Sequence, residues 1–122
     1  MEIDLKNYIE NSIPELRGRI YPLFTTDLSG VCLVYFFTPV SGGHLKQSEL
    51  ELRIIGQDYD ACEAIRKQLD GCLDMEEDEP YKTYGHTRFH SELSGGGNQF
   101  NDEIQMYENT MIYTLKWRQI NE

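Results

Sequence analysis

Three consecutive glycines, Gly95 to Gly97, are the first segment of this chain whose residue types could do chemistry. Glycine-rich loops can surround a phosphate with backbone N–H groups, but a Walker-type loop also needs a lysine and then a hydroxyl residue. Asn98 and Gln99 follow here instead, and the segment does not open a β-α-β unit, so a dinucleotide fingerprint fails as well. The sequence predicts a mobile, non-catalytic loop between two strands.

Metal binding would have to use the three histidines, His44, His86 and His90. The residues around His86 and His90 look extended, which separates the two rings by about 13 Å at about 3.3 Å per residue and prevents them from sharing an ion. A site that joins one histidine to a distant carboxylate would indicate a small metal-dependent hydrolase, and it stays open as an alternative. The favoured interpretation is a polar surface with no metal and no cofactor.

Nucleophile motifs do not appear in the sequence. No serine lies in a GxSxG elbow, and Cys32, Cys62 and Cys72 are odd in number and lack CxxC spacing. We expect three reduced, buried thiols. No carboxylate pair can be singled out for acid–base work among 21 acidic residues. The sequence therefore predicts that the protein is not an enzyme and has no catalytic residues.

The elements that would position any site form one α+β domain over residues 1–122. The predicted order is α-β-β-β-α-β-β: an antiparallel or mixed sheet of about five strands, with two helices on one face. Apolar periodicity, Pro14 and a capping Asp58 define the helices. The predicted elements are a helix at 3–13, an edge strand at 18–24, a central strand at 31–40, an alternating strand at 49–55, a helix at 58–73, a polar strand at 86–93 and a long strand at 104–120.

Composition excludes several classes of protein. Hydrophobic residues make up 39% and charged residues 26% of the chain, which is too apolar for disorder and too polar for a membrane protein. The longest apolar run, Val31 to Phe37, has the length of a strand, and the first eight residues do not resemble a secretory signal. We expect the chain to stay in a cytoplasm.

The formal charge of −10 argues against a reader of DNA sequence, because nucleic-acid affinity is built largely from basic residues. Much of this charge lies in Asp74 to Glu79, which is read as a solvated loop. Aromatic residues are abundant, and they suggest contact with other proteins. The predicted partner-contact residues are Tyr35, Phe37, Ser41, Gly42, Gly43, His44, Gly95, Gly96, Gly97, Asn98, Gln99 and Phe100.

Several short blocks resemble the tail terminator, or tail completion, proteins of long-tailed bacteriophages. The blocks touch most of the chain, although each is short. Val31 replaces the family's usual proline, and the acidic insertion Asp74 to Glu79 is a further departure. The matching blocks are Ile13-Pro14 with Gly18 to Pro22, Cys32 to Tyr35, Leu50 to Ile55, Asp58-Tyr59-Asp60 with the helix after it, and the long closing strand.

The resemblance implies a structural protein of a phage or prophage virion, made in the host cytoplasm and placed in the tail. Identical subunits would close into a ring, expected to be a hexamer, at the head-proximal end of the tail. The ring would contact the tail tube protein and the head connector or head completion protein, and no membrane. DNA would pass through its acidic lumen without specific binding.

Two other structural functions stay open at this stage. One is a related head–tail connector, or head completion protein. The other is an acidic DNA mimic that inhibits a nucleic-acid-binding protein. The net charge fits a mimic, but the strongest acidic cluster occupies one loop and not phosphate-like intervals along a surface.

Overall fold

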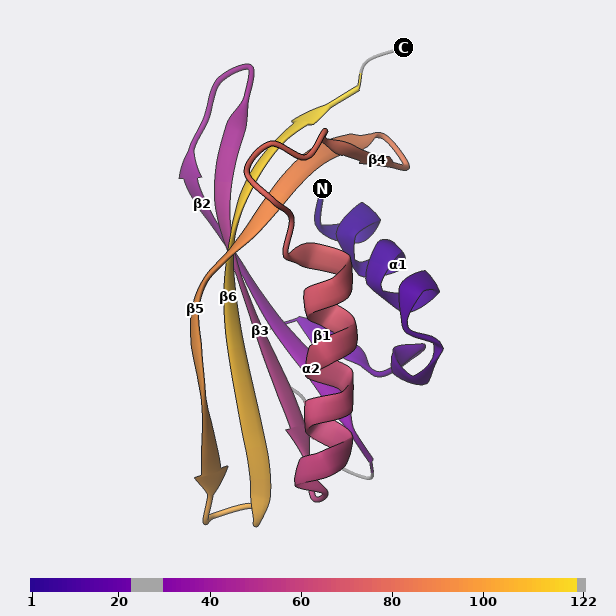
Figure 1. Ribbon diagram of the computed structural model, residues 1–122, viewed down its shortest axis with the longest axis vertical. Helices are drawn as coiled ribbons and strands as arrows, with labels where there is room; N and C mark the ends of the chain where they lie inside the picture. Colours follow the sequence, from indigo (N-terminus) through magenta and orange to yellow (C-terminus); the bar gives the residue numbers. More distant parts are fainter. Residues whose placement is uncertain (23–29, 121–122) are drawn as a thin grey trace.

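The computed structural model describes residues 1–22 and 30–120, which form two helices packed on one face of a mixed sheet (Figure 1). Six strands make up the described sheet, in the order β1-β2-β3-β6-β5-β4. The predicted α+β class is confirmed, with six strands in place of about five. The elements are α1 (Glu2–Ser12), a 3-10 turn η1 (Pro14–Leu16), β1 (Ile20–Pro22), β2 (Cys32–Ser41), β3 (Lys46–Gly56), α2 (Tyr59–Leu73), β4 (Lys82–Tyr84), β5 (Thr87–Asn101) and β6 (Met106–Gln119).

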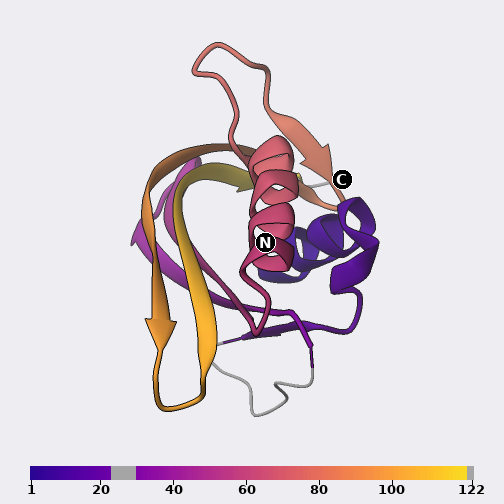
Figure 2. The ribbon, with the colours of Figure 1, turned by 60° about the horizontal axis from the view of Figure 1, so that its bottom comes forward.

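Both helices begin and end close to where the sequence predicts. The side chain of Asp58 caps α2 by accepting a hydrogen bond from the Asp60 N–H at 3.0 Å, which satisfies one of the unpaired donors of the first turn. The apolar stripe of α2 faces the sheet, with Cys62, Leu69 and Leu73 completely buried. Figure 2 shows α2 lying across the sheet, with α1 beside it.

The centre of the sheet is built from β3 and β6, which pair antiparallel along almost their whole length. Their alternating residues place Leu50 opposite Tyr113 and Leu52 opposite Met111 on the helix-covered face. The period-two alternation predicted for β3 is therefore confirmed. Fully burying a residue such as Leu52 contributes about 1.5–3 kcal/mol, so this row is a main source of stability.

The edges of the sheet differ from the prediction in two respects. Strand β2, predicted to be central, lies second from the edge, because β1 pairs with it in parallel from Ile20 to Pro22. The edge strand predicted at 18–24 is found over Ile20 to Pro22, and residues 23 and 24 of that prediction lie outside the described part of the chain. The short strand β4 was not predicted, since three polar residues carry too little periodicity to be recognised.

The glycine segment is the main correction. Gly95 to Gly97 do not form a loop but continue β5 as far as Asn101, and Gly97 lies opposite Thr110. A register shift between Leu93 and Gly95 marks a bulge in the strand. The long partner β6 supplies the pairing that the intrinsic preference of glycine opposes, so tertiary structure overrides local propensity.

Asp4 joins α1 to the turn between β4 and β5. Its Oδ2 accepts hydrogen bonds from the Thr87 hydroxyl at 2.7 Å and from the His86 N–H at 3.2 Å. The Thr87 hydrogen bond is the main cause that lowers the pKa of Asp4 below its usual 3.8, against a smaller opposing effect of burial. The ionised carboxylate therefore stabilises the fold.

Because the folded pKa is depressed, this stabilisation is present above pH 3.8 and is lost as the pH falls through the lower folded value. We expect Asp4→Ala to lower the free energy of unfolding by about 1 kcal/mol at pH 7. The difference from the wild type should shrink below pH 3.8 and vanish in stronger acid, as measured by urea unfolding. Asp60→Ala, an exposed acid in the first turn of α2, is the control. A pH-independent loss would contradict the assignment.

Candidate assembly surfaces

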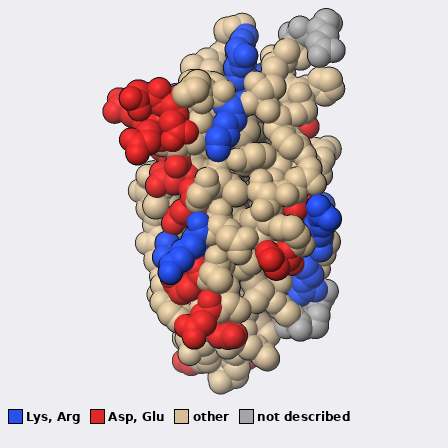
Figure 3. Space-filling view, turned by 45° about the vertical axis from the view of Figure 1, so that its right-hand side comes forward, with Lys and Arg blue, Asp and Glu red and all other residues tan. Residues whose placement is uncertain are grey.

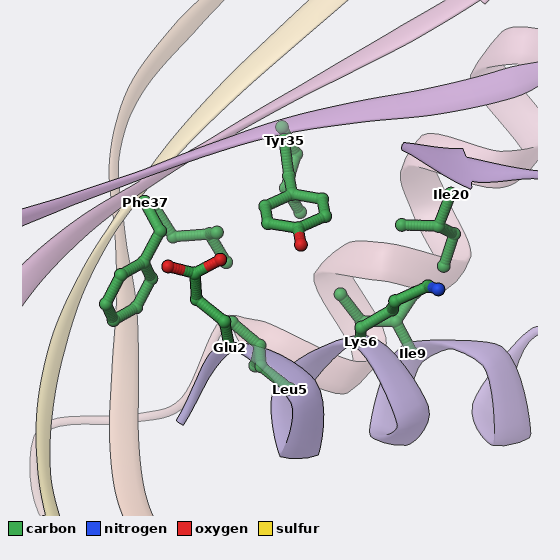
Figure 4. Close-up of a pocket in the computed structure, with 9 residues that line it drawn as sticks. Glu2, Leu5, Lys6, Ile9, Ile20, Tyr35 and Phe37 are labelled. Atoms are coloured by element: carbon green, nitrogen blue, oxygen red, sulfur yellow. The ribbon is translucent and has the colours of Figure 1, made fainter. Parts of the chain in front are cut away.

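A small apolar hollow lies between α1 and β2 on the helix-covered side of the molecule. Figure 4 shows Tyr35 and Phe37 pointing from β2 toward α1, with Glu2 and Lys6 approaching from the helix. Its volume is about 10 Å³, which is room for one water molecule at most. Burial, followed by the charge and hydrogen bond of Glu2, raises the pKa of Tyr35. This hollow is too small to bind a substrate.

Residues 1–22 and 30–120 contain no group of three His, Cys, Asp or Glu residues that could hold a metal. Burial, and then the charge of Asp58, raises the pKa of the Cys62 thiol to about 11, so this thiol is a poor nucleophile. Cys32 is buried as expected, whereas Cys72 is only partly buried. In the described part of the chain, no helix is long and apolar enough to cross a membrane.

A polar layer joins the far half of β5 to α2. The Asn98 amide donates to the Tyr59 hydroxyl at 3.2 Å and to the Glu63 carboxylate at 3.3 Å, and Asn109 donates to the same carboxylate at 3.0 Å. A hydrogen bond from Arg66 is the main cause that lowers the pKa of Glu63. Asn98, predicted to contact a partner, therefore has a contact within the subunit, which orients the end of β5.

The predicted contact residues Ser41 to His44 lie in the tip of the β2–β3 hairpin. All four are exposed, and Val40 and Leu45 beside them expose 57% and 45% of their surface. Figure 1 shows this tip at the opposite end of the molecule from the β5–β6 turn. The hairpin is an exposed arm with apolar shoulders, which is typical of a contact surface.

The other predicted group, Gly95 to Phe100, forms an exposed stretch of strand. Every residue from Glu92 to Phe100 is exposed, including Leu93 at 42% and Phe100 at 44%. One edge of this stretch pairs with β6, and no strand in residues 1–22 or 30–120 covers the other edge. The structure thus separates the predicted residues into two surfaces at opposite ends of the sheet, while Tyr35 and Phe37 lie half-buried beside α1.

Exposed apolar residues outside the predicted set extend both surfaces. Ile3, at the start of α1, is 75% exposed and borders a second, wider hollow with Phe37 and Trp117. Helical periodicity contained a signal for Ile3, because it falls off the apolar stripe of Leu5 and Ile9. Leu93 gave no signal, since one leucine in a polar strand does not show which face it occupies.

Charge is unevenly distributed over the molecule. Figure 3 shows acidic side chains in separate groups, the densest of them near the upper end of the view. In the loop Asp74 to Glu79, Met75 is buried, and its backbone N–H donates to the Ser91 carbonyl at 2.9 Å. The loop predicted to be only solvated therefore also covers part of the β5 edge.

The sheet face opposite the helices carries both signs of charge. By register, Glu49, Glu51 and Glu108 share this face with Arg53, and toward one end the basic residues Lys116 and Arg118 follow on β6. Arg118 lies directly opposite Arg88 of β5, an arrangement that is unfavourable between like charges. Glu108 is buried, and its carboxylate accepts hydrogen bonds from the Gln99 and Asn101 amides, so Glu49 and Glu51 supply the accessible negative charge of this face. The basic residues lie toward one end.

Comparisons with known proteins relate this arrangement to two solved structures. A chain of a structure described as the virion of a native gene transfer agent particle superimposes with a TM-score of 0.64 at 9% identity, covering 93% of this chain and 94% of that chain. A second solved chain, whose name states no function, gives a TM-score of 0.65 at 13% identity, covering 99% of this chain and 92% of the other.

Sequence comparisons give no closer relation. No protein-family model matches the chain, and no curated protein matches it. The structural likeness extends over nearly the whole length of both neighbours, so it covers the complete fold and not one motif. At these identities the likeness establishes a shared fold: this chain has the same fold as a component of a gene transfer agent virion.

Proposed function

We propose that this protein is a structural component of a phage-like virion that forms a ring at the head-proximal end of the tail. The ring ends the growth of the tail tube and joins the tail to the head connector. The observation that carries this proposal is the full-length likeness to a chain of a gene transfer agent virion. The resemblance of the sequence to tail terminator proteins supports the proposed location at the head-proximal end of the tail.

The two exposed surfaces support assembly into a ring. The β2–β3 hairpin with Ile3 forms one surface, and Leu93 to Phe100 of β5 forms the other. Because the two surfaces differ in composition and lie at opposite ends of the sheet, a contact between them is heterologous, and such contacts repeat from subunit to subunit until a ring closes. The proposed ring is a hexamer, and its flat ends contact the tail tube protein and the head connector.

The charge of the chain suits a passage for DNA. A net charge of −10 repels phosphate groups and so removes the contacts that cause non-specific binding. Glu49 and Glu51 lie at least partly exposed on the sheet face that the helices leave uncovered, which makes this face the candidate lining of the lumen. Lys116 and Arg118 would then lie near one mouth of the passage.

Sedimentation and negative-stain microscopy of concentrated protein, with and without tail tube protein, test the proposal. We expect ring-shaped oligomers that bind to the ends of tubes. Leu45→Glu should raise the protein concentration needed for assembly at least tenfold, because it buries a charge in the proposed contact. Gln68→Glu adds the same charge on the exposed side of α2 and should assemble like the wild type. If the protein stays monomeric, does not bind tubes and binds a basic protein, the result would favour the alternative function as a DNA mimic.

A further inference from the structure

We propose that the subunits of this ring join edge to edge, and this inference rests on the proposed function. The free half of β5 in one copy pairs antiparallel with the free half of β2 in the next copy, and Phe100 lies opposite Phe37. The sheets of all copies then form one continuous barrel, with the helices outside.

The free edge of β5 begins where the protection of the strand ends. Up to Leu93 this edge is covered: β4 pairs with Thr87 to Phe89, the Ser91 N–H donates to the Met75 sulfur at 3.4 Å, and the Leu93 N–H donates to Asp74 Oδ1 at 3.2 Å. Beyond the bulge, alternate residues turn their N–H and C=O groups toward the same edge, and among the described residues they meet no strand. No proline or lysine guards this stretch, although exposed edges are usually guarded in this way.

The glycines of this stretch are only partly explained by the single subunit. A side chain on Gly96, whose φ is +154°, would collide with the Thr110 carbonyl, so glycine is required there. Gly97 has an ordinary backbone conformation, and nothing within 4 Å would touch a Cβ atom. Without a side chain at Gly97, the face of this strand opposite the helices stays flat beside the free edge.

The free edge of β2 lies at the other side and the other end of the same sheet. Among residues 1–22 and 30–120, β1 covers β2 as far as Tyr35, and Thr38 to Ser41 are exposed. The Leu33 N–H donates to the Arg19 carbonyl at this edge, so by alternation Phe37 and Pro39 face the same way. Pro39 offers only its carbonyl oxygen, which leaves this edge one donor short but able to pair.

Strand directions allow the two edges to join. β2 is antiparallel to β3, β3 to β6, and β6 to β5, so β5 runs opposite to β2. In a ring every copy has the same orientation about the axis, and a neighbour's β2 placed beside β5 continues the antiparallel alternation. Tyr35 is already paired with Pro22 of β1, so a neighbouring strand can pair with β2 only after Tyr35 in the chain. On this edge of β2, Phe37 is then the first aromatic residue that can lie opposite Phe100.

The offset between the two edges matches the geometry of a closed barrel. Within one subunit Gln99 lies level with Cys32, through Glu108 and Ile55, whereas the proposed pairing brings it opposite Thr38 of the neighbour, six residues further along β2. Six residues correspond to about 20 Å along the strands, and the four strands from β2 to β5 span about 19 Å across them. A ring without axial shift then requires strands tilted by about 45°, at the upper end of the 35–45° typical of barrels.

The side chains at this junction are complementary on the helix-covered face. Phe100 is 44% exposed in the single subunit, and Phe37 is half-buried at the rim of the wider hollow that Ile3 and Trp117 also line. Within the subunit the Phe100 ring packs edge-on against Tyr107, with the ring centroids 5.0 Å apart. A cross-strand aromatic pair next to this hollow would bury the part of the Phe100 ring that stays exposed. Such pairs stabilise a sheet by about 0.2–1 kcal/mol beyond a pair of alanines.

Disulfide trapping with the double variant Thr38→Cys/Gln99→Cys tests the pairing. The two positions face each other on the sheet face that the helices leave uncovered, as a pair without direct backbone hydrogen bonds, where Cα atoms are about 4.5 Å apart and a disulfide can form. Mild oxidation of concentrated protein should give a ladder of covalent oligomers on a non-reducing gel, and a reductant should abolish it. Cys32 and Cys62 are fully buried, but Cys72 is partly exposed, so all variants carry Cys72→Ser. In this background the parent protein and both single variants should give no ladder.

Sedimentation of the same samples separates the outcomes. Oligomers without a ladder would overturn the strand pairing and leave the ring in place, whereas monomers at every concentration would overturn both proposals. A disulfide-linked dimer of Gln99→Cys alone would show that β5 edges pair with each other about a two-fold axis, against the proposal. A ladder from Thr38→Cys/Gly97→Cys and not from the first pair would overturn the register.

Discussion

Gly96→Val should lower the free energy of unfolding by about 2–4 kcal/mol, because a side chain at this position meets two separate penalties. Its Cβ atom would collide with the Thr110 carbonyl oxygen and lie 3.2 Å from the Met111 Cα atom. The φ of +154° is also a backbone conformation that residues with a side chain rarely adopt. Urea unfolding followed by circular dichroism measures the loss.

Gly97→Val is the matched control for this prediction. The next residue along β5 has an ordinary φ, and nothing lies within 4 Å of its Cβ position. Valine favours strands where glycine opposes them, so this variant should be as stable as the wild type or more stable by up to about 1 kcal/mol. Equal losses for both variants would mean that the strand bulge, and not the close approach of Gly96, governs the region.

Leu52→Ala should destabilise the protein by about 2–5 kcal/mol, which is a large part of the total stability of a domain of this size. Leu52 is completely buried in the middle of β3, between Tyr35 of β2 and Met111 of β6. Removing its side chain leaves a cavity next to the existing hollow under α1, and rigid strands on both sides prevent the cavity from closing. Thermal and urea unfolding should both show the loss.

Leu45→Ala provides the corresponding control on the surface. Leu45 exposes 45% of its surface at the β2–β3 hairpin, so truncation should change the stability of the monomer by less than about 0.5 kcal/mol. The same variant should weaken oligomerisation if the hairpin contacts a neighbour. A stability loss as large as that of Leu52→Ala would show that the hairpin packs against its own subunit.

Much of the fold follows from periodicity that the core imposes. Leu50, Leu52 and Ile54 alternate because one face of β3 is buried, and the stripe of α2 recurs at helical spacing for the same reason. Pro22 likewise fixed β1 at an edge through its missing donor. Such patterns involve residues close together in the chain, so they can be recognised from the sequence alone.

The second half of β5 could not be predicted, because the cause of its structure is not local. Gly95 to Gly97 prefer no regular structure, and they become a strand only because β6 is long enough to pair with them. The position of β2 was missed for a related reason. β2 is not at the edge because three residues of β1 pair with it, and such a short parallel pairing leaves no periodic pattern in the sequence.

The sequence predicted which residues form the candidate surfaces, but not where these residues lie on the sheet. Ser41 to His44 and Gly95 to Phe100 stood out by glycine content, and both groups are exposed. Aromatic content alone indicated Tyr35 and Phe37, which turn toward α1. Which edge each group occupies, and at which height on the sheet, depends on register between strands distant in sequence, so it emerges only from the folded chain.

The packing of Asp74 and Met75 against β5 also protects the protein from uncontrolled aggregation. Together with β4, which pairs with Thr87 to Phe89, this segment occupies the first half of the edge and limits the length of backbone on which a foreign strand could add. A fully open 15-residue edge would allow unlimited, unstaggered stacking of chains, as in amyloid. The methionine and aspartate therefore set how far one molecule can adhere to the next, and favour closed assemblies over fibres.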